Sequence, residues 1–275
     1  MAEKAPIGIF DSGYGGLTVL DEIRKSLPGY DFIYLGDNAR NPYGTRSFDV
    51  VLQFTLEGVK KLFEMGSQLI ILACNTASAK ALRNIQQKFL PYYFPDKRVL
   101  GVLRPTTEII GDITKTKNIG ILGTTGTVLS NSYVIEIGHF FPQVKVYQQA
   151  CPLWVPLIEN NEHQSNGADY FVKKYIDELF TQNNNIDTIL LACTHYPLLM
   201  EKIKKYVNSG INIISQGPIV ANSLVDYLKR HPEIDEKCSQ NNTIHFHTTD
   251  STEVFDKHAT VFFNEIIFSE HIEIK

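Results

Sequence analysis

The sequence has few cysteines and no long apolar run. Its 275 residues include four cysteines, Cys74, Cys151, Cys193 and Cys238, and no two of them form a CxxC pair. This spacing excludes a zinc ribbon and gives no sign of a disulfide framework. No stretch approaches about 18 consecutive apolar residues, and the first strand pattern follows residues 1–6 without an apolar signal core. We therefore predict a cytoplasmic protein without a membrane partner.

The sequence also lacks a strong excess of positive or negative charge. The formal net charge is −4, and the lysines and arginines are scattered along the chain. Nucleic-acid-binding proteins gather basic residues into a patch or stripe, so we expect no nucleic-acid partner. The composition is 43% hydrophobic and 20% charged, which is ordinary for a globular protein with enough apolar residues for two cores.

Short apolar runs alternate with longer amphipathic segments along the chain. The short runs, typical of strands, cover residues 7–10, 32–35, 69–73, 99–103, 119–122, 144–147, 188–192 and 211–214. The longer segments, typical of helices, cover residues 17–27, 48–65, 76–89, 129–140, 169–180, 197–207 and 218–230. This alternation predicts an α/β fold with mostly parallel sheets and helices on both faces.

The helical pattern is interrupted from Pro91 to Lys97 and the strand–helix rhythm then restarts. We predict two similar doubly wound domains with the active site in the cleft between them. Residues 1–97 together with 212–275 would form the first domain, and residues 98–211 the second.

One pattern occurs twice, at residues 70–76 (IILACNT) and 189–195 (ILLACTH). In both copies a cysteine follows an apolar strand and precedes a helix, which places the thiol at the carboxyl edge of a parallel sheet. A buried cysteine is often only a small core residue, but here the flanking polar residues repeat as well. Two thiols from related halves could face one ligand and move a proton between opposite faces of a carbon.

The residues after each thiol suit an anionic substrate. Asn75 and Thr76 begin one helix, and Thr194 and His195 precede the other. The amino end of a helix favours negative charge, so we expect it to lower the pKa of the thiol and to hold a carboxylate. His195 could exchange a proton with its neighbouring thiol.

Two further strand ends carry polar turns. At residues 10–18 a glycine-rich turn follows Asp11, which could be a helix cap or a catalytic group. A dinucleotide fingerprint would need a glycine where Thr18 stands, so a nicotinamide oxidoreductase is a weaker alternative. At residues 36–44, Asp37 and Arg40 could pair with each other, and Tyr43-Gly44 could hold a carboxylate.

Four segments together, residues 10–18, 36–44, 73–77 and 191–198, resemble the signatures of the cofactor-independent aspartate/glutamate racemase family, in family order and over nearly the whole chain. The glutamate racemases are the most similar branch. The resemblance implies that Cys74 and Cys193 are the two bases, one for D-glutamate and one for L-glutamate, assisted by Asp11 and His195.

The resemblance also implies a wider site and its partners. Residues expected to contact substrate are Asp11, Ser12, Tyr43, Gly44, Asn75, Thr76, Thr194 and His195, and residues expected to support them are Asp37, Glu159, Thr124 and Thr127. The family pattern implies no cofactor, no metal, a homodimer, and D-glutamate made for peptidoglycan. No lysine stands out as an anchor for pyridoxal phosphate.

Two further alternatives stay open from the sequence. An aspartate racemase would differ mainly in the pocket for the distal carboxylate. A non-catalytic binding homologue would keep the fold, although both thiols are present here.

The segment 103–107 (LRPTT) departs from the family pattern, which implies a small, glycine-containing sequence after the proline. We expect this departure to affect local loop packing or the response to an effector rather than the chemistry.

Overall fold

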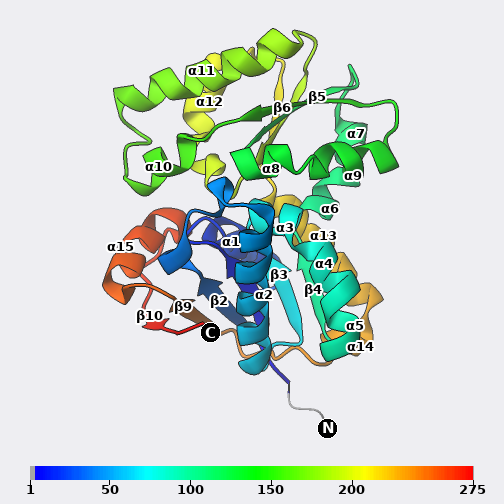
Figure 1. Ribbon diagram of the computed structural model, residues 1–275, viewed down its shortest axis with the longest axis vertical. Helices are drawn as coiled ribbons and strands as arrows, with labels where there is room; N and C mark the ends of the chain where they lie inside the picture. Colours follow the sequence, from blue (N-terminus) through cyan, green and yellow to red (C-terminus); the bar gives the residue numbers. More distant parts are fainter. Residues whose placement is uncertain (1–3, 275) are drawn as a thin grey trace.

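Two parallel β-sheets organise the chain, one in each half of the molecule (Figure 1). The computed structural model describes residues 4–274. The strand order is β10-β9-β2-β1-β3-β4 in the first sheet and β6-β5-β7-β8 in the second, and neighbouring strands run parallel throughout. The predicted α/β class with two parallel sheets is confirmed.

The strands are short and mostly apolar. Those of the first sheet are β1 (Ile7–Asp11), β2 (Phe32–Gly36), β3 (Leu69–Leu72), β4 (Arg98–Gly101), β9 (Ile244–Thr248) and β10 (Ser269–His271). Those of the second sheet are β5 (Asn118–Gly123), β6 (Lys145–Ala150), β7 (Thr188–Ala192) and β8 (Asn212–Ile214). The central strands β1, β3 and β7 are buried along their whole length, as parallel strands covered on both faces require.

The helices connect and cover these strands. They are α1 (Leu17–Ser26), α2 (Phe48–Glu64), α3 (Asn75–Lys80), α4 (Leu82–Asn84), α5 (Leu90–Tyr93), α6 (Leu103–Thr107), α7 (Ile110–Ile113), α8 (Thr125–Leu129), α9 (Ser132–Phe140), α10 (Trp154–Glu159), α11 (Asn166–Gln182), α12 (Met200–Tyr206), α13 (Gly217–Arg230), α14 (Pro232–Asp235) and α15 (Thr252–Phe263). Shorter turns are η1 (Asn38–Arg40), η2 (Tyr43–Thr45), η3 (Ile85–Phe89) and η4 (Tyr196–Leu199).

The two faces of the first sheet belong to different core clusters. Ile7 and Ile9 of β1 share a cluster with Leu20 of α1, whereas Phe10 belongs to the other cluster and lies against Gly58 of α2. Successive side chains of a strand point to opposite faces, so β1 contributes to both layers. No helix within residues 4–274 has the length and apolar character that a membrane crossing requires.

Two strands, β4 and β8, do not belong to the sheets that the predicted domain boundaries would assign them to. β4 follows residue 97 but pairs with β3 in the first sheet, and β8 follows residue 211 but pairs with β7 in the second. Each strand extends the open edge of the sheet that the chain has just built, and the chain crosses over only afterwards. The division into two domains at these residues stays a prediction.

The break predicted from Pro91 is partly wrong. Residues 90–93 form the short helix α5, with Pro91 in its first turn, where the missing N–H costs no hydrogen bond. The helix predicted at residues 76–89 is divided into α3, α4 and the π-type turn η3. The Leu90 N–H donates to the Ile85 carbonyl, and Pro91 cannot donate to the carbonyl four residues before it.

A buried carboxylate ties the C-terminal segment to the first sheet. Asp31, which precedes β2, accepts hydrogen bonds from the backbone N–H groups of Asn241 and Thr243, at 3.0 and 2.9 Å. It also accepts from the Asn241 amide at 2.6 Å and the Thr243 hydroxyl at 2.8 Å. Burial raises the pKa of Asp31, but these donors outweigh it and hold the pKa well below the usual range. The residues just before β9 are thereby fixed beside β2.

We predict that Asp31→Ala lowers the free energy of unfolding by about 3 kcal/mol, because several donors lose a charged acceptor. Urea unfolding at neutral pH measures the change. Asp177→Ala is the control, since it removes an exposed pair with Lys173 and should cost less than about 1 kcal/mol. The contribution of Asp31 is present above its unfolded pKa of about 3.9 and is lost as the pH falls below it. Equal losses in the two variants at neutral pH would contradict this role.

Candidate active site

A cavity of about 80 Å³ lies where the carboxyl edges of the two sheets meet. Predicted site residues from both halves line it together: Ser12, Tyr43, Gly44, Cys74, Asn75, Thr76, Thr124, Cys193, Thr194 and His195. Its volume is several times that of one water site, which suits a ligand of amino-acid size. The other predicted site residues, Asp11, Asp37, Glu159 and Thr127, are not among the residues that line the cavity.

Cys74 caps the amino end of α3 and is almost fully buried. Its Sγ donates to the Ser12 Oγ at 3.5 Å and accepts from the Ala77 N–H at 3.4 Å. Burial, followed by the charge of Asp11, raises the pKa of this thiol to about 12. The expectation that the helix end lowers this pKa is wrong, because desolvation outweighs the hydrogen bonds from Ser12 and Ala77.

Asp11 is completely buried at the end of β1, next to the cavity-lining Ser12 in the sequence. One carboxylate oxygen accepts from the Gly13 N–H at 3.0 Å, and the other has no hydrogen-bond partner within residues 4–274. Burial raises the pKa of Asp11 to about 6, against the lowering effect of His195 and of two backbone N–H groups. The pKa of this carboxyl group therefore lies closer to neutral pH than that of an ordinary aspartate.

The second thiol has a different neighbourhood. The Cys193 Sγ lies 3.9 Å from the His195 Nδ1, and the His195 Nε2 lies 2.9 Å from a Glu159 carboxylate oxygen. Burial lowers the pKa of His195, but the hydrogen bonds with Cys193 and Glu159 outweigh it and raise the pKa to about 10. Although burial raises the pKa of Glu159, the hydrogen bond from His195 brings it below its ordinary value.

Glu159 also connects the two halves of the molecule. The oxygen that faces His195 accepts a second hydrogen bond, at 2.8 Å, from the amide of Asn41 in the loop after β2. The family resemblance implies a supporting role for Glu159, but no local pattern identifies its partners, because Glu159 lies at the end of α10, far along the chain from both. Its position follows only from the tertiary structure.

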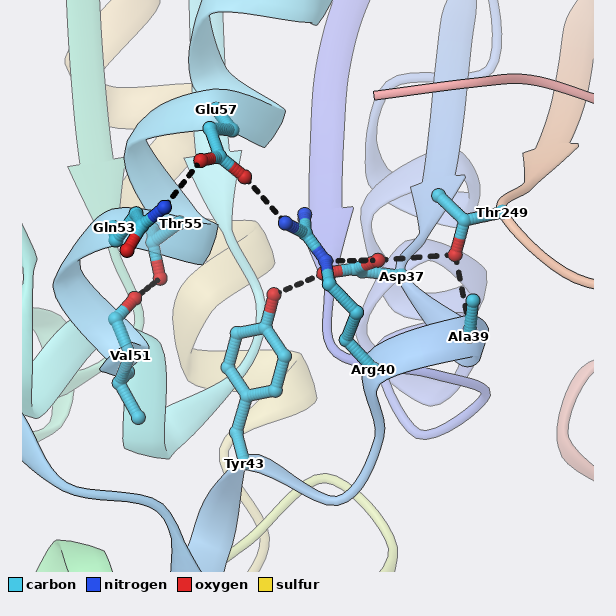
Figure 2. A network of polar contacts seen from close by, with 9 residues as sticks. All are labelled: Asp37, Ala39, Arg40, Tyr43, Val51, Gln53, Thr55, Glu57 and Thr249. Atoms are coloured by element: carbon cyan, nitrogen blue, oxygen red, sulfur yellow. Dashed lines mark hydrogen bonds and ion pairs between the residues drawn. The ribbon is translucent and has the colours of Figure 1, made fainter. Parts of the chain in front are cut away.

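Asp37 anchors the loop that carries Tyr43 (Figure 2). This buried carboxylate accepts from the Arg40 Nε, the Tyr43 hydroxyl and the Thr249 hydroxyl. Arg40 also pairs with Glu57 of α2. The Asp37–Arg40 pair and the ligand-binding loop were alternatives in the sequence, but in the structure the pair holds the loop in place.

Three threonines join the helix starts on the two sides of the cavity. The Thr76 hydroxyl lies 2.9 Å from the Thr124 hydroxyl and 3.4 Å from the Thr127 hydroxyl. Thr124 and Thr127 belong to the turn after β5 and to α8, while Thr76 belongs to α3. The predicted supporting pair thus contacts the first half through Thr76.

The glycine-rich first turn allows the two halves to approach closely. A Cβ atom on Gly15 would lie 2.2 Å from the Thr194 Oγ1 and 2.4 Å from the His195 Nδ1. Next to it, the Thr18 hydroxyl donates to the Thr194 carbonyl at 3.0 Å. Glycine at position 15 therefore allows this turn to pack against Thr194 and His195, where any larger residue would clash.

Several lining residues were missed by the sequence reasoning: Asn41, Pro42, Thr45, Thr125, Cys151, Pro152, Val155 and Pro156. Those at 42, 45 and 125 directly adjoin predicted residues, and the one at 41 lies within the polar turn predicted at residues 36–44, so the loops themselves were a signal. Those at 151–156 follow β6, whose place beside β5 puts its carboxyl end at the same sheet edge. Within residues 4–274, no cluster of three or more histidine, cysteine or acidic side chains is arranged to hold a metal ion.

Known proteins with similar sequences belong to one family of racemases. Residues 12–224 match the model of the Asp/Glu/Hydantoin racemase family. A glutamate racemase from Sulfurihydrogenibium sp. (strain YO3AOP1) is 37% identical over 270 residues, which cover 98% of this chain and 97% of the relative.

Solved structures agree with the sequence relatives. A glutamate racemase isoform from Bacillus anthracis superposes with a TM-score of 0.89 at 33% identity, covering 98% of this chain and 97% of the other. Glutamate racemase from Francisella tularensis in complex with D-glutamate has a TM-score of 0.87 at 29% identity, covering 98% of both chains. This chain is a member of the Asp/Glu/Hydantoin racemase family.

Proposed function

We propose that this protein is a glutamate racemase that interconverts L- and D-glutamate by two-base proton transfer between Cys74 and Cys193. The observation that carries the proposal is that both thiols line one small cavity from opposite sheets. The curated relative and both structural relatives are glutamate racemases, and one of these structures holds D-glutamate.

The chemistry needs one thiolate and one thiol at a time. The Cys193 thiolate removes the Cα proton while the Cys74 thiol delivers its own proton to the opposite face of the carbon. The electron pair of the broken C–H bond stays at Cα and forms the new C–H bond there. Afterwards Cys193 is a thiol and Cys74 a thiolate, which are the states that the reverse direction uses.

The two thiols are prepared for these states in different ways. Cys74 rests as a thiol at neutral pH, because its pKa is raised to about 12. Asp11, with its pKa near 6 and one unpartnered oxygen, is the group that can accept the Cys74 proton when the opposite direction begins. The His195 imidazolium, held by Glu159, stabilises negative charge on Cys193.

We infer that the polar lining holds the two carboxylates and the ammonium group of glutamate. Ser12, Thr76 and Thr194 offer hydroxyl groups from three strand ends, and Tyr43-Gly44 offers backbone N–H groups from the loop that Asp37 anchors. Donors fixed before the substrate arrives lower the cost of carbanionic charge at Cα. On the family resemblance we further propose a cytoplasmic homodimer that supplies D-glutamate for peptidoglycan.

The direct test uses protein stripped of bound small molecules, incubated with glutamate or aspartate in deuterium oxide. We expect racemisation of L- and D-glutamate and deuterium at Cα without any added cofactor. If deuterium is incorporated at Cα of aspartate but not of glutamate, the proposal that glutamate is the substrate is wrong. A requirement for added nicotinamide or pyridoxal phosphate would overturn the mechanism.

The two-base mechanism predicts that Cys74→Ser and Cys193→Ser each lower kcat for racemisation by at least about a thousandfold, because each thiol is needed in both directions. Chiral chromatography of the product measures this loss. Cys238→Ser is the matched control: this thiol is buried as well, but it bonds the Ile234 carbonyl and does not line the cavity. Retained racemisation in the double variant Cys74→Ser/Cys193→Ser would remove both thiols from the mechanism.

The raised pKa of His195 predicts a pH effect. Its imidazolium persists up to about pH 10 and is lost above that pH. Glu159→Gln removes the carboxylate that holds the charge, so the pKa of His195 should fall towards its ordinary value of about 6.5. The basic limb of the kcat/KM profile, in the direction that begins with the Cys193 thiolate, should therefore move to lower pH by at least about one unit.

Glu162→Gln is the control for this experiment, since Glu162 is exposed beyond the end of α10. Its profile should match that of the unmodified protein. A Glu159→Gln variant with an unchanged basic limb would show that the Glu159–His195 contact does not set the charge of the imidazole.

A further inference from the structure

Asn75 lines the cavity next to Cys74, and its side-chain amide can present either an oxygen or an NH₂ group to a ligand. The orientation decides whether the residue attracts or repels a carboxylate. In the structure the Asn75 Oδ1 accepts a hydrogen bond of 2.5 Å from the Tyr133 hydroxyl. Asn75 is almost fully buried, and the hydrogen bonds among residues 4–274 include none from its Nδ2, which leaves this donor for a ligand in the cavity that Asn75 lines.

Tyr133 lies on α9, in the half of the molecule opposite Asn75, and is completely buried. Burial raises the pKa of Tyr133 well above its ordinary value, so the phenol keeps its proton and acts as a donor. The same hydroxyl oxygen accepts from the Gln216 Nε2 at 2.8 Å. Because Gln216 uses its NH₂ group there, it cannot accept the phenol proton, and the Asn75 oxygen does so.

The orientation of Gln216 is determined in turn by a backbone carbonyl. The Gln216 Nε2 donates to the Val102 carbonyl at 2.9 Å and lies 3.0 Å from the Thr106 hydroxyl. A carbonyl can only accept, so the NH₂ group of Gln216 must face it. The Gln216 Oε1 is left buried without a partner within residues 4–274. Such a cost is tolerated where a polar network has a specific role.

Gln216 and Val102 lie where the chain passes between the two sheets. Val102 follows β4 on the way to the second sheet, and Gln216 follows β8 on the way back to the first. Their hydrogen bond joins the two crossovers, and Tyr133 extends the network to the cavity. The Val102 carbonyl fixes the orientation of the Gln216 amide, Gln216 fixes the direction in which the Tyr133 hydroxyl donates, and Tyr133 fixes the orientation of the Asn75 amide.

We propose that Tyr133 and Gln216 are positioning residues that fix the Asn75 amide with its NH₂ group towards the cavity, where it binds a carboxylate of the substrate. This inference rests on the proposed function and deepens it. Without the Tyr133 hydroxyl, the Asn75 amide is free to turn its oxygen towards the substrate, where it would repel a carboxylate. The arrangement also makes carboxylate binding depend on the contact between the two crossovers.

The test compares Tyr133→Phe, Asn75→Ala and the double variant. Tyr133→Phe should raise KM for D-glutamate, and Kd from calorimetry, by about tenfold, with kcat changed by less than about threefold. Once Asn75 is replaced by alanine, adding Tyr133→Phe should raise KM no further, because the amide that Tyr133 orients is absent. Additive losses in this cycle would overturn the inference and leave Tyr133 with a structural role only.

Tyr206→Phe is the matched control, because its hydroxyl donates to Asp169 at 3.0 Å, away from the cavity. Its KM should not change. Asn75→Asp tests the same point without altering Tyr133: it keeps the acceptor for the phenol but lacks the NH₂ donor, so KM should rise at least as far as in Asn75→Ala. A wild-type KM in Asn75→Asp would overturn the inference.

The unmodified protein separates this inference from the proposed function. If it binds glutamate but does not racemise it, the proposed function fails, while the Kd values of the variants still decide the role of Tyr133. If it racemises glutamate and Tyr133→Phe leaves both KM and Kd unchanged, only the inference fails. If it neither binds nor racemises glutamate, both fail.

Discussion

The structure depends on the meeting of two sheet edges. Parallel strands deliver their carboxyl ends to one side of a sheet, and here both sheets turn that side towards the same small cavity. Hydrogen bonds across the boundary hold the edges together, among them Asn41 to Glu159 and Thr18 to Thr194. In the proposed mechanism, the two thiols can act on one carbon only while this arrangement persists.

Within this shared geometry the electrostatics of the two thiols differ. Cys74 is surrounded by a buried carboxylate, a serine hydroxyl and one backbone N–H, and burial dominates its ionisation. Cys193 lies beside an imidazole whose positive charge is supported by Glu159. Two similar strand ends thus carry thiols with unlike partners, which suits the proposed reaction, because that reaction needs one thiolate and one thiol at the same time.

Buried polar residues give the site its precision. Asp37 collects three side-chain donors and thereby fixes the loop of Tyr43, while Gln216 joins both crossovers to the side chain of Tyr133. Such networks are costly when a single member is lost, because the remaining groups stay buried without partners. Because of this cost, residues that do not touch the cavity, such as Asp37 and Gln216, can still determine where the cavity-lining side chains lie.

The amino-acid sequence was enough to predict the α/β class, the places of most strands and helices, and the segments that carry Cys74 and Cys193. These follow from local patterns: apolar periodicity, turn residues at strand ends, and one motif that occurs twice. Three other features depend on how the whole chain packs: the sheets to which β4 and β8 belong, the raised pKa of the buried Cys74, and the distant side chains that meet at Glu159 and Gln216. Desolvation and contacts between residues far apart in the chain arise from packing, which no local pattern encodes.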